Sequence, residues 1–290
     1  MNTYSLKDQR LAEFDQIVKT LMLKKYEKDM PWYDSVWLHR FLVAQQLIQQ
    51  VQPTKVADFI HAFNPLRTDP NFEIQQVKET FNFKILQKIK NIIASLPTDT
   101  HERHEIDRFG RLIVHDHLFF SELQRSLVQI VSELAGEDVE PSYNFLSLYS
   151  GFGVCEPHID APSAKWTLDI CIDQSDEWPI NFSQIVPWPD SPVYSHKDWQ
   201  TQIKKSPSLN FSSYTLKPNE ALLFSGSSQW HYRDAVLDSS PDRFCHLLFL
   251  HYIPVGMSKI VDPKNWADIF DIPELAGLGF SDPRLAFESG

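Results

Sequence analysis

The sequence predicts a helical N-terminal region packed against a β core that forms an antiparallel sandwich or barrel. Two patterns support this. In the first hundred residues, apolar side chains recur at steps of three and four, as in amphipathic helices. After Pro141, short runs of branched and aromatic residues alternate with turn-rich stretches, without helices between them. At 290 residues, the chain is long enough to bury a full core without disulfides or structural metals.

Helices are predicted over residues 6–26, 37–51 and 82–96. Pro53 and Pro97 follow the second and third helix and prevent their continuation. The segment FNPLRTDPNF between these two helices is predicted to be a loop. A fourth helix is predicted over 121–134, starting at Ser121 and ending near Gly136. Residues 1–100 are therefore expected to form the helical region.

Strands are predicted over 144–150, 165–173, 220–226 and 245–253, within a core that spans residues 101–260. The run KWTLDICID alternates strictly, which is typical of a strand with two different faces. Residues 178–213 contain five prolines and are predicted to be an inserted loop. Its tryptophans either cover a substrate or hold the loop against the core: Trp178, Trp188 and Trp199. The tail, 261–290, is expected to wrap the surface.

Composition excludes several classes of protein. The chain carries 27 Lys+Arg and 38 Asp+Glu, a net charge of −11, which argues against nucleic-acid binding. No apolar run is long enough for a membrane span, and the N-terminus does not resemble a signal peptide, so a cytoplasmic location is expected. Three widely spaced cysteines without a CxxC pattern predict free thiols. The oligomeric state stays open.

One stretch, YSGFGVCEPHIDA, predicts a metal site. His158 and Asp160 are two residues apart, so on a strand their side chains leave the same face. His231, which follows the apolar run ALLFSG, is the best candidate for a third ligand from a distant strand. Two histidines and one carboxylate on one face of a metal are the arrangement of non-haem Fe(II) oxygenases.

The same stretch resembles a known family. Residues 149–160 read Y-x-G-x-G-x-x-E-P-H-x-D, which is similar to the metal-binding stretch of the prolyl 4-hydroxylase-like Fe(II)/2-oxoglutarate dioxygenases. Residues 165–178, 216–236 and 243–254 resemble later segments of that family, so the similarity covers roughly 107–254. The resemblance implies a mainly β fold with α, in which a double-stranded β-helix (a jelly-roll, cupin-like core) carries the N-terminal helical layer.

The resemblance also implies the roles of six residues. His158, Asp160 and His231 would bind Fe(II), and Tyr149 would contact the co-substrate 2-oxoglutarate unless it is only a core aromatic residue. Arg243, twelve residues after His231, is the preferred partner for the far carboxylate of 2-oxoglutarate, and Arg233 is the rival.

The implied reaction consumes O₂ and 2-oxoglutarate, releases succinate and CO₂, and hydroxylates a C–H bond. Related halogenases lack the carboxylate that Asp160 supplies, so oxidation of a C–H bond rather than halogenation is expected. The expected substrate is a small molecule, such as an amino acid or a natural-product intermediate. The chain departs from the family in two places: it has EWPINF where the family has a Gly-Gly turn, and His231 lies 73 positions after His158. Two alternatives remain: a peptide or protein hydroxylase of the prolyl hydroxylase type, and a cupin-like metal-binding protein without 2-oxoglutarate activity.

Other histidines have weaker signals. His115 and His117 are expected at the mouth of the core or in solvent. His246 and His251 lie on opposite faces of the last predicted strand, so one of them can face the pocket.

Overall fold

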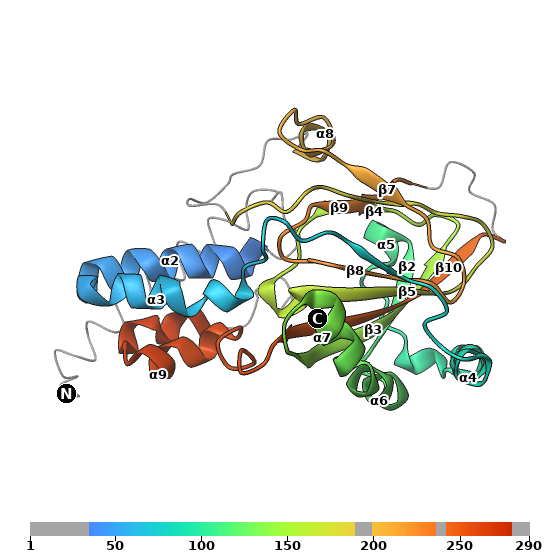
Figure 1. The fold of residues 1–290 in the computed structure, drawn as a ribbon, viewed down its shortest axis with the longest axis horizontal. Helices are drawn as coiled ribbons and strands as arrows, with labels where there is room; N and C mark the ends of the chain where they lie inside the picture. The colour runs from blue at the N-terminus through green and yellow to red at the C-terminus, as the bar shows by residue number, and fades with distance from the viewer. Residues whose placement is uncertain (1–34, 189–198, 236–241, 280–290) are drawn as a thin grey trace, which may run out of the picture.

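The computed structural model describes residues 35–188, 199–235 and 242–279 (Figure 1). The helix predicted over 6–26 lies outside the described residues. Among the described residues, no helix combines the length and the apolar character that a membrane crossing needs.

The described helices and strands agree with the predicted fold class. The helices are α2 (Ser35–Val51), α3 (Val56–Ala62), α4 (Phe83–Ser95), α5 (Ile106–Phe109), α6 (Leu118–Ser126), α7 (Val128–Ala135), α8 (Trp199–Lys204) and α9 (Trp266–Phe270). The strands are β1 (Gln75–Val77), β2 (Arg111–His115), β3 (Val139–Ser150), β4 (Cys155–His158), β5 (Trp166–Gln174), β6 (Ile180–Phe182), β7 (Ser212–Tyr214), β8 (Ala221–Phe224), β9 (His231–Arg233) and β10 (Phe244–Pro254).

The strands form two antiparallel sheets. The larger sheet has the order β1-β8-β5-β10-β3-β2, and the smaller one has the order β4-β9-β6-β7. The eight strands from β3 to β10 are thus divided between the sheets as 8-5-10-3 and 4-9-6-7. This is the jelly-roll connection of two Greek keys. The prediction of a jelly-roll core is therefore confirmed.

The two faces of the larger sheet bury different side chains. Its outer face packs against α4, α6 and α7 through an apolar cluster that includes Leu168, Ile170 and Ile172 of β5 (Figure 1). Its inner face turns toward the smaller sheet, and Cys171 and Leu222 on this face share a second cluster with Phe182 of β6. The alternation of KWTLDICID is therefore explained by the position of β5: one face packs on the helices, and the other faces the space between the two sheets.

Helices α2, α3 and α9 form a layer beside the jelly roll (Figure 1). The described part of the tail, residues 261–279, does not wrap the surface as expected but closes this layer, because Trp266, Leu275 and Leu278 are fully buried in it. Trp37 of α2 donates a hydrogen bond from Nε1 to the carbonyl oxygen of Val261, at 2.6 Å. Segments from both ends of the described chain thus share one core.

Two local predictions differ from the structure. The helix predicted over 121–134 is divided at Leu127 into α6 and α7. The Ser126 hydroxyl donates to the Leu123 carbonyl at 2.7 Å, a side-chain bond that competes with regular helix hydrogen bonding. Within 178–213, β6 and β7 belong to the smaller sheet rather than to a loop. Strands of three residues are too short to show a period in the sequence.

Candidate metal centre

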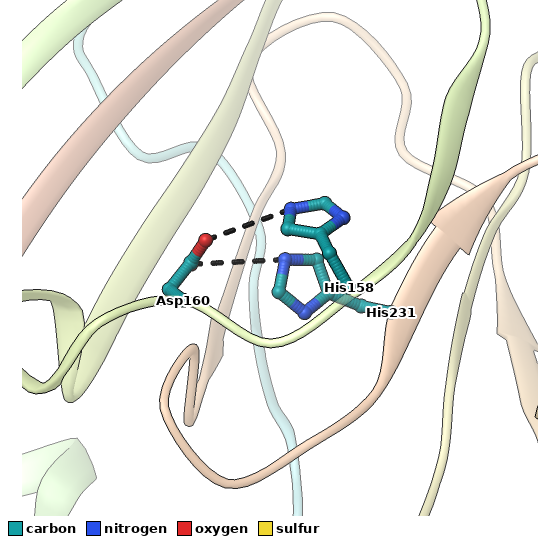
Figure 2. Close-up of side chains that lie close together, drawn as sticks. All are labelled: His158, Asp160 and His231. Carbon is teal, nitrogen blue, oxygen red and sulfur yellow. Dashed lines mark ion pairs between the residues drawn. The ribbon is translucent and has the colours of Figure 1, made fainter. Parts of the chain in front are cut away.

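His158, Asp160 and His231 come together at the end of the smaller sheet (Figure 2). His158 ends β4 and lies opposite His231, the first residue of β9, with ring centroids 4.1 Å apart. The Asp160 carboxylate oxygens lie 3.5 Å from Nε2 of His158 and 3.7 Å from Nε2 of His231. Bonds of about 2.1 Å to one metal, at right angles, would set such atoms about 3 Å apart. The three side chains therefore fit a metal ion after a small contraction.

Backbone carbonyls fix the tautomers of both histidines. Nδ1 of His158 lies 2.7 Å from the carbonyl oxygen of Glu156, and Nδ1 of His231 lies 2.9 Å from that of Gln229. A carbonyl only accepts, so each Nδ1 carries the proton and donates it. In the neutral form of each ring, Nε2 then has its lone pair toward Asp160, as in metal-binding histidines.

The approach of Asp160 depends on Gly226, which follows β8. The Asp160 N–H donates to the Gly226 carbonyl at 2.9 Å. A Cβ atom on Gly226 would lie 2.5 Å from the Asp160 carboxylate and 2.5 Å from the Ala164 carbonyl. Both contacts are too short for a real side chain, so the backbone can come this close only at glycine.

The two histidines differ in their protonation. Burial, together with the neighbouring His158, holds the pKa of His231 well below its ordinary value. Burial also acts to lower the pKa of His158, but Cys155 and Asp160 outweigh it and raise this pKa to about 9. His231 is therefore neutral, whereas a metal has to displace a proton from His158.

A cavity of about 260 Å³ opens from these side chains into the space between the sheets. The metal-ligand candidates form one wall, from the smaller sheet. Strands β2, β3, β5 and β10 of the larger sheet form the opposite wall, with Tyr149 and Arg111 among its polar residues.

The structure places the two predicted arginines in different surroundings. Arg233 lines this cavity, but its Nη2 donates to the buried Asp169 at 2.9 Å and its Nη1 donates to the Trp178 carbonyl. Arg243 lines a separate cavity, where its Nε lies 3.2 Å from the carboxylate of Asp176. Of the two, only Arg233 shares the cavity of the metal-ligand candidates.

Arg111 of β2 is a cation in this cavity that sequence reasoning missed. It lies opposite Tyr149 in the register of β2 and β3, and its Nη1 donates to the Tyr149 hydroxyl at 2.8 Å. Its Nε donates to Glu105. Burial acts to lower the pKa of Arg111, but Tyr149 and Glu105 raise it above its ordinary value, so the guanidinium stays charged. The run RLIVH suggests a strand, yet only the register shows where Arg111 points.

The remaining predicted residues are also dispersed. Trp178 packs edge-on against Tyr149, at 4.8 Å, whereas Trp188 belongs to the helical layer, so these two do not form one cover over the cavity. His115 lines the cavity and bonds to Glu102 through Nδ1, at 2.6 Å. His251 lines the cavity as well, while His246 does not.

No family model matches the chain, and no curated protein matches it. Among solved structures, it is similar to HygX from Streptomyces hygroscopicus with nickel, 2-oxoglutarate and hygromycin B bound, at 10% identity and a TM-score of 0.48, over 68% of this chain and 86% of HygX.

It is also similar to SnoK, a non-haem α-ketoglutarate-dependent carbocyclase from nogalamycin biosynthesis, at 12% identity and a TM-score of 0.48, over 62% of this chain and 79% of SnoK. The match to EctD from S. alaskensis, with 2-oxoglutarate and 5-hydroxyectoine, has 14% identity and a TM-score of 0.45, over 63% of this chain and 72% of EctD. The chemistry of the site therefore has to be inferred from its own residues.

Proposed function

We propose that this chain is a non-haem Fe(II)- and 2-oxoglutarate-dependent dioxygenase that hydroxylates a C–H bond of a small molecule. The observation that carries the proposal is the placement of two histidine Nε2 atoms and one carboxylate within 4.8 Å of one another, on one wall of a cavity. Two histidines and one carboxylate leave positions open for a co-substrate and O₂ on iron.

The donor set fits Fe(II). His158, Asp160 and His231 would hold the metal, with the backbone carbonyls of Glu156 and Gln229 orienting the two imidazoles. When bound, Fe(II) would activate O₂, which is the oxidant: two of its four electrons would come from 2-oxoglutarate, which leaves as succinate and CO₂, and two from the C–H bond that is hydroxylated. The protein's own residues hold this group, exclude water and orient the C–H bond. Asp160 occupies the place that a halide would need, so hydroxylation is the proposed outcome.

The far carboxylate of 2-oxoglutarate needs a cation, and we assign this role to Arg111 together with Tyr149. Arg111 uses Nε and Nη1 for its hydrogen bonds to described residues, which leaves Nη2 for a ligand. Both arginines are paired with an acid, Arg111 with Glu105 and Arg233 with Asp169, but Arg233 is the weaker candidate because both of its terminal nitrogens already donate to described residues. A guanidinium and a phenol hydroxyl suit a carboxylate by charge and by geometry.

The cavity also bears on the substrate. Its volume of about 260 Å³ is small, and it lies between the two sheets. This favours a small molecule, or the end of one, over a peptide that would lie across the surface.

The test is anaerobic binding of Fe(II) and then 2-oxoglutarate, followed by visible absorption. The wild type should show a charge-transfer band, and His231→Ala should not. If wild type binds Fe(II) yet shows no band with 2-oxoglutarate, the proposal is wrong and the cupin-like alternative takes its place.

The same band measures the affinity for 2-oxoglutarate in Arg111→Met, Arg233→Met and Arg243→Met. Arg111→Met removes a charge-assisted hydrogen bond, so its Kd should rise about 10- to 100-fold. Arg243→Met is the matched control, since Arg243 lies at another cavity, and its Kd should equal that of wild type. Weak binding by Arg243→Met alone would contradict the assignment of Arg111.

A further inference from the structure

The wall of the cavity that faces the metal-ligand candidates is aromatic. Tyr143 and Phe145 come from β3, and Phe249 and His251 come from the neighbouring strand β10; all four line the cavity. Phe145 stacks on Phe249 with centroids 4.8 Å apart, and Tyr143 stacks on His251 at 4.1 Å. Tyr143, Phe145 and Phe249 stay partly exposed although they lie on the inner face of the sheet. Their rings thus offer a ligand a continuous aromatic surface.

His251 supplies a second and independent feature. Its side chain is buried, with 2% of its surface exposed, and its Nδ1 lies 3.0 Å from the Thr167 hydroxyl. Its Nε2 is buried without a hydrogen-bond partner among the described residues. A buried polar atom without a partner is costly, and such atoms are rare in native proteins. This nitrogen therefore points to a hydrogen-bonding group on a ligand.

Apart from Nη2 of Arg111, which the proposed function assigns to 2-oxoglutarate, the charged groups around this wall are paired among described residues. Arg111 donates to Glu105, Arg233 donates to Asp169, and His115 bonds to Glu102. Burial, with His115 and Arg111 nearby, lowers the pKa of His251 to about 3, so its ring is neutral. With the free donor of Arg111 taken by 2-oxoglutarate, this wall offers a second ligand no further charge, which favours an uncharged one.

We infer that this wall binds the substrate of the proposed dioxygenase, and that the inserted part of the substrate is a flat, uncharged aromatic ring with a hydroxyl or carbonyl group. The ring makes aromatic contact with the Phe145–Phe249 pair, and the polar group bonds to Nε2 of His251. The inference rests on the proposed function for the reaction, but the binding of an aromatic ring can be measured on its own.

The test uses two probes of similar size, phenol and cyclohexanol, which share a hydroxyl group but differ in the ring. Each is titrated calorimetrically into the full chain, loaded anaerobically with Fe(II) and 2-oxoglutarate. Wild type should bind phenol saturably and cyclohexanol several-fold more weakly, because only phenol can stack. The visible band of the same samples reports separately on the metal and 2-oxoglutarate.

Three variants assign the binding to the wall. His251→Leu should weaken phenol binding about tenfold by removing one hydrogen bond. Phe249→Leu should reduce the preference for phenol over cyclohexanol. His251→Gln keeps a hydrogen-bonding group and should recover part of the affinity. His246→Leu is the matched control on the same strand, because His246 lies outside the cavity, and it should bind phenol like wild type.

Several outcomes separate this inference from the proposed function. Equal binding of both probes by wild type, or unchanged phenol binding by both His251→Leu and Phe249→Leu, would overturn the inference even when the band is present. Loss of the band in His251→Leu would show that His251 takes part in binding 2-oxoglutarate, which would also overturn the inference. A missing band in wild type with phenol binding that depends on His251 would refute the dioxygenase and still support the aromatic subsite.

Discussion

At the scale of single residues, Gly226 controls how closely Asp160 approaches the histidines. A Cβ atom here would lie 2.5 Å from the Asp160 carboxylate, so we expect Gly226→Ala to push Asp160 away. Displaced supporting groups typically lower metal affinity about 10- to 100-fold. Competition titration with Ni(II) and a coloured chelator measures this change.

The control for this substitution is Gly136→Ala at the end of α7. Gly136 has a φ of +71°, and a Cβ atom added to it would meet no other atom within 4 Å, so alanine would strain the backbone without touching a neighbour. It should destabilise the protein by about 1 kcal/mol and leave Ni(II) affinity unchanged. Equal Ni(II) affinity in both alanine variants would show that Gly226 does not position Asp160.

His251 predicts a pH dependence of stability. The pKa of His251 is about 3 in the folded protein, because burial disfavours its charged form, and about 6.5 in the unfolded chain. The unfolded chain thus binds more protons between these values, and the stability that His251 contributes is complete above pH 6.5 and lost as the pH falls toward 3.

Relative to His251→Leu, the metal-free wild type should therefore lose about 2 kcal/mol of unfolding free energy between pH 7 and pH 5. Urea denaturation of both proteins with a chelator present measures this difference. A constant difference across that range would mean that His251 is not buried as a neutral ring.

The residues that could be predicted from the sequence are those with a local pattern. His158 and Asp160 share a face because they are two apart, and His231 follows a recognisable apolar strand. The arginine proposed to bind the far carboxylate of 2-oxoglutarate could not be predicted from a local pattern. Arg243 has a suitable distance along the chain from His231, but the space between the sheets receives Arg111, which only the pairing of β2 with β3 brings beside Tyr149.

At the scale of elements, the strands that hold the metal-ligand candidates are the short ones. Strands β4 and β9 pair at Cys155↔Arg233 and His158↔His231, with an irregularity between, whereas β3 and β10 pair along most of their length. We expect bound Ni(II) to slow amide hydrogen exchange at residues 155–160 and 226–233, since a ligand that clamps a weakly paired region suppresses its local opening. Mass spectrometry of exchange with and without Ni(II) measures this.

Exchange in β3 and β10 should be the same in both states. Asp160→Ala with Ni(II) is the control and should resemble the metal-free wild type. Slower exchange throughout the molecule, rather than at these two segments, would contradict the view that the metal stabilises β4 and β9 locally.

The same elements show why patterns miss short strands. The alternation of β5 and the long apolar runs of β3 and β10 could be recognised because their inner and outer faces bury different clusters. Strand β6 has three residues, of which Ile180 and Phe182 are buried, and a single alternation is not distinguishable from a loop. Its place in the smaller sheet is set by pairing with β9 and β7.

At the scale of the whole molecule, the helical layer and the jelly roll are joined beside the metal centre. Trp188 packs against Phe41 of α2, with centroids 5.6 Å apart, and its Nε1 donates to the Ser227 carbonyl at 3.2 Å. Ser227 follows Gly226 in the chain, and Thr68 bonds to Ser225 on the other side at 2.7 Å. The loop that supports Asp160 is thus held by the helical layer.

This connection predicts that the described parts unfold together. Phe41 is 2% exposed, and Phe41→Ala would leave a cavity among Trp37, Phe59 and Phe63, which should destabilise the protein by about 3–5 kcal/mol. Because the layer supports the loop at Gly226, urea unfolding of both proteins should occur in one transition, with the same midpoint by tryptophan fluorescence and by far-UV circular dichroism. The opposite result would be that Phe41→Ala loses its helical circular dichroism at a lower urea concentration than the rest of its structure. If the protein still bound Ni(II) above that concentration, the jelly roll would hold its metal centre without the layer.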